Sequence, residues 1–201
     1  MTRSQRDALL GLARRRGTLS ARDAGAAGIH SQVLTRLVDE GVLERIARGQ
    51  YRLAGRGVSE HDGLVIVAAV VPQGVICLLS ALAFHGIGTQ LPHAVWVAIE
   101  HGSREPVLAY PPVRVVRLSG RSFTHGVERH SLEGQRVRVY SVAKTLADVF
   151  KFRNTVGIDV ALEALRESWT DRRFIMDDLV RAARVCRVGR VMRPYLDAIV
   201  A

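Results

Sequence analysis

The chain has 201 residues, of which 48% are hydrophobic and 24% charged, and its formal net charge is +10. The sequence shows no internal repeat, low-complexity tract or disordered acidic tail. Its length has room for a small domain of about 55 residues beside a larger one with its own core. The strongly basic balance indicates an anionic partner such as nucleic acid.

No targeting or membrane segment is expected. The N-terminus is charged and lacks the apolar run of a signal peptide, so we expect a cytoplasmic protein. The longest apolar stretch, residues 64–84, is interrupted by Pro72, Gln73 and Gly74 and by Ser80, which argues against a membrane span.

Residues 17–53 show the pattern of a winged helix-turn-helix. Apolar residues in helical register over residues 4–16 predict a first helix, and Ser20 with Asp23 three positions on resembles a capping box at the start of a second. A third, amphipathic helix follows, and then two short apolar runs flank a basic turn with Gly49. Three helices before a hairpin are therefore expected.

The third helix has two unlike faces. With Ser31 as its N-cap, Val33, Leu34 and Leu37 recur at the spacing of a buried face. The opposite face is polar and is predicted to enter the major groove of DNA with Ser31, Gln32, Thr35 and Arg36. The acidic residues Asp39 and Glu40 lie at the far end, where Gly41 is suited to stop the helix.

The hairpin is predicted to be a cationic wing. Its candidate contacts with DNA are Arg45, Arg48, Gln50 and Arg52. Residues 1–56 hold 11 basic and 5 acidic side chains, so +6 of the total charge lies in this quarter of the chain. A winged helix that docks protein is the alternative, because 27 Arg against 2 Lys indicates a bias toward arginine along the whole chain.

A linker rich in small and polar residues is expected at residues 55–59, between a winged helix at 1–56 and a second domain at 58–201.

The second domain is predicted to be α+β. Helices are expected at 64–71, from a cap at Ser80 to residue 85, and at 142–153, 158–168, 176–185 and 191–199, with Ser141 and Asp171 as start signals. Strands are expected at 95–100, 113–118, 126–130 and 136–140 in a mainly antiparallel sheet covered by helices.

No catalytic residue, metal site or cofactor is predicted. Glu100 lacks the partner carboxylates of a metal-dependent nuclease, and Ser80, His85 and Asp148 lack the sequence context of a hydrolytic triad. The histidines fall on different elements. Cys77 and Cys186 have no metal-ligand spacing and are expected in the core, whereas Lys144 and Lys151 are expected in solvent.

The N-terminal pattern resembles the winged helix of AbiEi-type antitoxins, and the resemblance continues along the chain. It is carried by GVICLLSALAFHGI and LPHAVWVAI within residues 74–99, by YSVAKTLADVFKFRNTVGIDVALEALRE at 140–167 and by VMRPYLDAIV at 191–200. The resemblance implies an antitoxin that represses its own operon by binding inverted repeats of double-stranded promoter DNA. It also implies a cognate nucleotidyltransferase-like toxin, counteracted directly or functionally.

Three interpretations stay open. The first is this antitoxin and autorepressor. The second is a stand-alone transcriptional regulator whose larger domain senses a ligand or drives assembly. The third is an enzyme that the winged helix directs to DNA. The gene beside this one distinguishes the first two, and a set of metal-binding carboxylates would favour the third.

Overall fold

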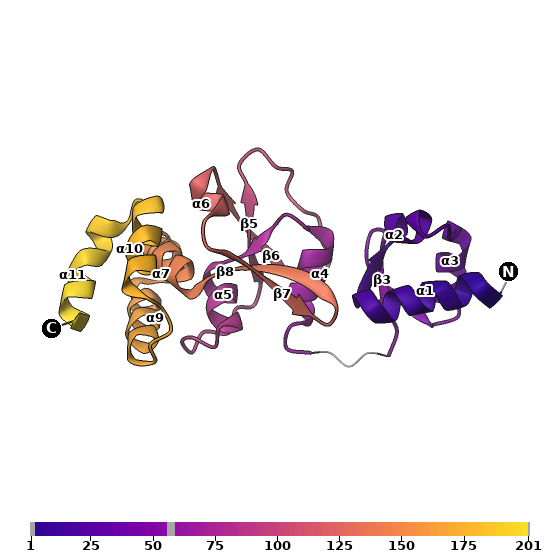
Figure 1. The fold of residues 1–201 in the computed structure, drawn as a ribbon, viewed down its shortest axis with the longest axis horizontal. Coiled ribbons are helices and arrows are strands. Elements are labelled where there is room, and N and C mark those ends of the chain that lie inside the picture. The colour runs from indigo at the N-terminus through magenta and orange to yellow at the C-terminus, as the bar shows by residue number, and fades with distance from the viewer. Residues whose placement is uncertain (1–2, 56–58, 201) are drawn as a thin grey trace. The chain divides into compact units, whose positions relative to one another are not determined.

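The computed structural model describes residues 3–55 and 59–200, and its ribbon is shown in Figure 1. The chain divides into two compact units. The first comprises Met1–Pro72, Pro106–Pro112 and His130–Val137, and the second Gln73–Glu105, Val113–Arg129 and Arg138–Ala201. The middle of the predicted linker, residues 56–58, lies outside the described residues.

The first unit contains the helices and the hairpin that the sequence predicts. Its elements are α1 (Arg3–Arg16), β1 (Thr18–Ser20), α2 (Ala21–Ala26), α3 (Ser31–Asp39), β2 (Leu43–Ala47), β3 (Gln50–Leu53) and α4 (Asp62–Val70). The strands form an antiparallel sheet in the order β1-β3-β2. Strand β1 was not predicted, because three residues are too few to show an alternation of apolar and polar side chains.

A capping box starts α2, as predicted. The Ser20 hydroxyl accepts a hydrogen bond from the backbone N–H of Asp23 at 3.0 Å, and the Asp23 carboxylate accepts one from the N–H of Ser20 at 2.9 Å. Burial alone would raise the pKa of Asp23, but these bonds and the Arg16 guanidinium outweigh it and lower that pKa. The box fixes the entry into the helix-turn-helix.

The first unit also includes α4 and the tip of the hairpin between β7 and β8. Helix α4 packs against β1 and β2. The tip lies against the start of β1: Gln135 is hydrogen bonded to Thr18, and a Cβ on Gly134 would come within 3.0 Å of the backbone of Arg16 and Gly17. Gly134 has a φ of 83°, so only glycine suits both its conformation and its space.

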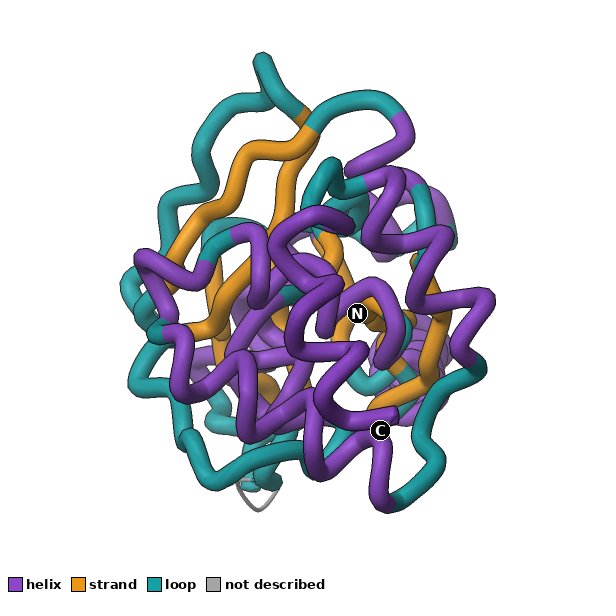
Figure 2. Tube along the Cα trace, turned by 90° about the vertical axis from the view of Figure 1, so that its left-hand side faces the viewer, coloured by secondary structure: helices purple, strands orange, loops and turns teal. Residues whose placement is uncertain are grey.

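The remaining elements build the larger sheet and its helices. They are β4 (Val75–Ile76), α5 (Leu78–Phe84), β5 (Val95–Glu100), β6 (Val113–Leu118), α6 (Arg121–Thr124), β7 (Val127–Leu132), β8 (Gln135–Tyr140), α7 (Val142–Lys151), α8 (Arg153–Val156), α9 (Ile158–Thr170), α10 (Met176–Val185) and α11 (Gly189–Val200). The α+β class is confirmed. Helix α7 contacts α5, α9, α10 and α11, and the C-terminal helices lie in front of the strands in Figure 2.

The larger sheet, in the order β6-β5-β4-β8-β7, is mixed. Strands β4 and β5 are antiparallel, whereas β5 with β6 and β4 with β8 are parallel. The sequence indicated mainly antiparallel pairing, but alternation places side chains on faces of a sheet and carries no information on the direction of neighbouring strands.

Three local predictions in the second unit are wrong. Ser80 does not cap a helix: it lies inside α5, is 4% exposed, and its hydroxyl accepts a hydrogen bond from the Trp96 N–H at 2.9 Å. Asp171 follows the end of α9 as its C-cap and starts no helix. Lys144 is fully buried in α7 instead of solvated, because its ammonium forms an ion pair with Asp148 one turn on.

This ion pair belongs to a buried polar cluster in the second unit. The Lys144 ammonium lies 4.1 Å from the centre of the Tyr140 ring, and the Cys186 thiol donates to the Asp148 carboxylate at 3.2 Å. Burial raises the pKa of Asp148, although the positive charge of Lys144 lowers it in part. Burial and the negative charge of Asp148 together raise the pKa of Cys186 to about 12. Cys186 and Cys77 are buried and free, as predicted.

Candidate nucleic-acid interface

Helix α3 has the two faces that the sequence predicts. Val33, Leu34 and Leu37 are buried in a core shared with α1 and β2. The opposite face is exposed and carries Ser31, Gln32, Thr35 and Arg36. One detail differs: His30 occupies the N-cap position without a side-chain hydrogen bond, so Ser31 is the first helical residue instead of the cap. The Ser31 hydroxyl is therefore not used in capping α3.

The turns around α3 set its position. Between α2 and α3, Gly28 adopts a φ of 72°, and Ile29, which is 4% exposed, donates its N–H to the Ala24 carbonyl at 3.0 Å. After α3, Gly41 adopts a φ of 68°, the left-handed conformation that ends a helix. Glu40, at this end, forms an ion pair with Arg6. The acidic end of α3 thus lies away from the polar N-terminal turn.

Strands β2 and β3 form the wing. Gly49 adopts a φ of 71° in the turn, and the register shifts between Arg45 and Ala47. Arg45 and Arg48 are exposed, and the Arg45 guanidinium donates to the Ala47 carbonyl at 3.3 Å. Gln50 is half-buried and pairs with Ser20 of β1 in the sheet. The two exposed arginines give the wing its accessible positive charge.

Arg52 has a different environment. Its side chain is 12% exposed and forms ion pairs with Glu44 and with Asp62, which is 6% exposed. Burial would lower the pKa of Arg52, but the two carboxylates outweigh it and raise that pKa. The guanidinium is therefore engaged inside the fold, and the contact with DNA predicted for Arg52 stays a prediction.

Arg22 is exposed on α2 and was not predicted from the sequence as a DNA contact. In helix-turn-helix proteins the first of the two helices crosses the DNA backbone. A basic residue inside the predicted capping box, between Ser20 and Asp23, was the signal that could have identified Arg22 as a candidate phosphate contact.

The segment from α1 to β3 matches a known family. Residues 7–54 match the family described as transcriptional regulator, AbiEi antitoxin. The segment is similar to AbiEi-type regulators. The resemblance stated from the sequence is confirmed over these residues, and the family is one of regulators rather than enzymes. No curated protein matches the chain.

The fold of the chain also has a solved counterpart. The crystal structure of the RV2827C protein from Mycobacterium tuberculosis aligns with a TM-score of 0.63 and 14% sequence identity. The alignment covers 96% of this chain and 77% of that one. At this identity the likeness shows the fold alone, and it extends over both compact units.

The residues considered for catalysis each have other partners. Ser80 bonds to Trp96, His85 Nε2 lies 2.7 Å from the Tyr140 carbonyl oxygen, and Asp148 is paired with Lys144. Among the described residues, no three His, Cys, Asp or Glu side chains are grouped to hold a metal ion. None of the helices within residues 3–55 and 59–200 is long and apolar enough to cross a membrane.

Proposed function

We propose that the chain is a DNA-binding antitoxin that represses its own toxin–antitoxin operon and counteracts a nucleotidyltransferase-like toxin. The observation that carries the proposal is the exposed polar face of α3, with Gln32 and Arg36, on a helix whose other face is buried. The match of residues 7–54 to AbiEi antitoxin regulators supports the same function.

In this proposal α3 enters the major groove at an inverted repeat in the promoter. The Gln32 amide suits the paired donor and acceptor of adenine, and the Arg36 guanidinium suits the two acceptors of guanine. The hydroxyls of Ser31 and Thr35 accept or donate hydrogen bonds next to the contacts of Gln32 and Arg36. Arg45 and Arg48 contact phosphates from the wing, which fixes the register of α3 without reading sequence.

We further propose that residues 1–56 bind DNA and residues 58–201 restrain the toxin, directly or by opposing its effect. Support comes from the charge: residues 1–56 hold 11 basic and 5 acidic side chains and the whole polar face of α3. The alternative is a stand-alone regulator that senses a ligand or assembles through residues 58–201.

Co-expression with the adjacent gene separates these functions. The full chain should restore growth of cells that express the neighbouring nucleotidyltransferase. Gln32→Ala/Arg36→Ala should restore growth equally while promoter repression is lost, because the toxin-restraining part is unchanged. A full chain that represses its promoter but never restores growth would leave the stand-alone regulator as the better account.

A further inference from the structure

Five cationic side chains converge on one pocket of the second unit, and the proposed function uses none of them. The pocket has a volume of about 740 Å³. The cations come from the start of α6, the end of α7, and the end of α10 with the turn after it: Arg121, Lys151, Arg181, Arg184 and Arg187. Ser119 and Ser122 also line the pocket, and no carboxylate is among its described lining residues.

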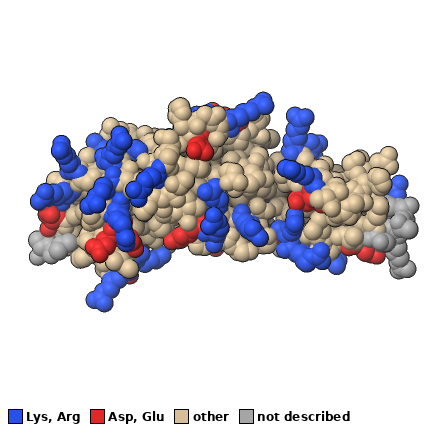
Figure 3. All heavy atoms as spheres, turned by 45° about the horizontal axis from the view of Figure 1, so that its top comes forward, with Lys and Arg blue, Asp and Glu red and all other residues tan. Residues whose placement is uncertain are grey.

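The positive charge of this pocket is mostly uncompensated. Arg181 forms an ion pair with Asp178, but the other four cations have no ion-pair partner within residues 3–55 and 59–200. Two largely buried cations elsewhere in the chain do have carboxylate partners: Arg52 is paired with Glu44 and Asp62, and Lys144 is paired with Asp148. Figure 3 shows Lys and Arg side chains gathered over the C-terminal helices. Like charges that line one pocket repel one another, and a bound anion would offset this repulsion.

His125 also lines the pocket, and the positive charges around the pocket affect its pKa. Burial lowers the pKa of His125, and the positive charges of Lys144, Arg121 and Arg181 lower it further, while Asp178 opposes them. The imidazole is therefore neutral at pH 7 and can donate one N–H to an anion.

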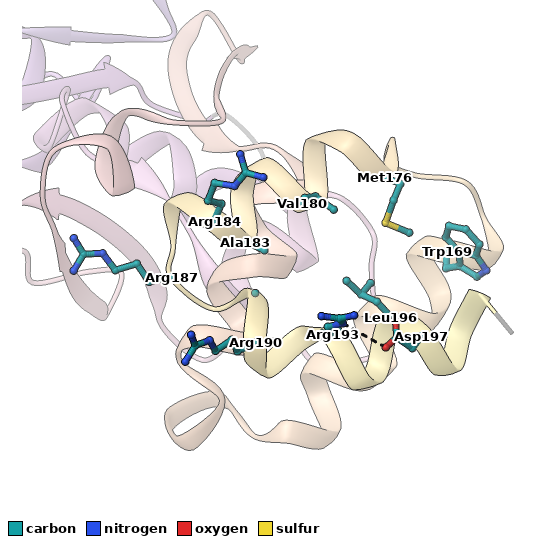
Figure 4. A pocket seen from close by; sticks show the side chains of 11 residues that line it. Trp169, Met176, Val180, Ala183, Arg184, Arg187, Arg190, Arg193, Leu196 and Asp197 are labelled. Atoms are coloured by element: carbon teal, nitrogen blue, oxygen red, sulfur yellow. Dashed lines mark ion pairs between the residues drawn. The ribbon is translucent and has the colours of Figure 1, made fainter.

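A neighbouring groove, drawn in Figure 4, is less suited to an anion. It has a volume of about 840 Å³ and shares Arg184 and Arg187 with the basic pocket. Trp169 and Met176 make its opposite end apolar, and Arg193 is paired with Asp197 at 3.8 Å. The groove thus carries charge of both signs, whereas the pocket carries one.

We propose that the basic pocket binds closely spaced phosphate groups, as carried by a nucleoside triphosphate or by the backbone of a nucleic acid. Guanidinium groups form paired hydrogen bonds with phosphate oxygens, and hydroxyls and a neutral imidazole add donors. The four cations without an ion-pair partner exceed what a single monoanion needs, so the ligand carries several negative charges. The volume of the pocket falls within the range of small-ligand sites.

The first test is calorimetric titration of the full chain with inorganic triphosphate and with ATP at low salt. Arg121→Gln/Arg187→Gln should weaken binding at least about tenfold, because each substitution removes a charge-assisted contact. Both side chains are exposed, so folding should be preserved. Arg166→Gln/Arg172→Gln, two exposed arginines that do not line the pocket, is the charge-matched control and should bind like the wild type. Absence of binding, or equal loss in both variants, would overturn the proposal.

The second test separates the two phosphate sources in a Gln32→Ala/Arg36→Ala background, so that failure of the winged-helix assignment does not affect it. Tight triphosphate binding that an oligonucleotide does not displace identifies a nucleotide. Displacement by a single-stranded oligonucleotide, lost in Arg121→Gln/Arg187→Gln, identifies a nucleic-acid backbone. In either case the bound phosphates should raise the pKa of His125 in an NMR titration. A His125 pKa that is the same with and without triphosphate would place the ligand elsewhere.

Discussion

The guanidinium of Arg52 is hydrogen bonded to the carboxylate of Asp62, which joins the last strand of the wing to the first turn of α4. The two side chains are 12% and 6% exposed. Arg52→Ala would leave the Asp62 carboxylate buried without its partner, so we expect a loss of about 3 kcal/mol in the free energy of unfolding. Urea denaturation measures this loss. Arg48→Ala, at an exposed position of the same hairpin, should change the free energy by less than about 0.5 kcal/mol. Equal stability of the two variants would show that the ion pair does not hold α4 to the wing.

Although Arg48→Ala should hardly change stability, it should weaken DNA binding. Arg48→Ala should reduce the slope of log affinity against log salt by about 0.9, the value for one lost phosphate contact. Fluorescence anisotropy with the promoter duplex at several salt concentrations gives the slope. Arg166→Ala, an exposed arginine on α9, should leave it unchanged. A slope that is the same for Arg48→Ala and the wild type would argue against contact between the wing and phosphate.

The buried pair in α7 gives a second test of stability. Lys144→Met should destabilise the second unit by about 3–5 kcal/mol, because Asp148 would remain buried without its cation. Lys144→Met/Asp148→Leu removes both charges and should recover much of that loss, since an apolar pair of similar size needs no desolvation of charge. Thermal and urea unfolding of the three proteins measure the difference. If the double variant is less stable than Lys144→Met alone, the cluster stabilises the fold by more than mutual neutralisation.

Fragments test where the DNA-binding part ends. A fragment of residues 1–72 keeps α4 and the Arg52–Asp62 bond, whereas residues 1–57 lose both. We expect both to recognise the promoter, since each contains α3 and the wing, but the shorter one to unfold at a lower temperature in circular dichroism. The bond matters little to the winged helix if the two fragments melt at the same temperature.

The elements that the sequence predicted best are those with long, regular patterns. Strands β5 and β6 occupy the predicted residues 95–100 and 113–118, because each is a short run rich in valine and other apolar residues. Helix α10 occupies the predicted residues 176–185, because its apolar residues recur with the period of a helix. The two faces of α3 follow from the same rule. Short β1, with three residues, had no period to detect.

Where the structure differs from the sequence predictions, the cause is often a contact between residues that are far apart in the sequence. The Ser80 hydroxyl looked like a cap because serine favours caps, yet its partner is an N–H of β5 that lies sixteen residues away in the sequence. Arg52 was predicted to contact DNA like Arg45 and Arg48, because its ion pair with Asp62 forms only in the folded chain. The basic pocket joins residues from 119 to 187, and no spacing in the sequence brings these together.

The proposed function depends on the polar face of α3 reading a specific promoter sequence, which a comparison of two duplexes tests directly. Anisotropy titrations would compare the promoter inverted repeat with a scrambled duplex of equal length, for the full chain and for Gln32→Ala/Arg36→Ala. We predict that the wild type prefers the repeat by at least about 4 kcal/mol and that the double variant loses roughly 1–3 kcal/mol per lost base contact, with affinity for the scrambled duplex falling much less. Equal affinity of the wild type for the two duplexes, or an unchanged preference in the double variant, would show that the polar face of α3 does not read the promoter sequence.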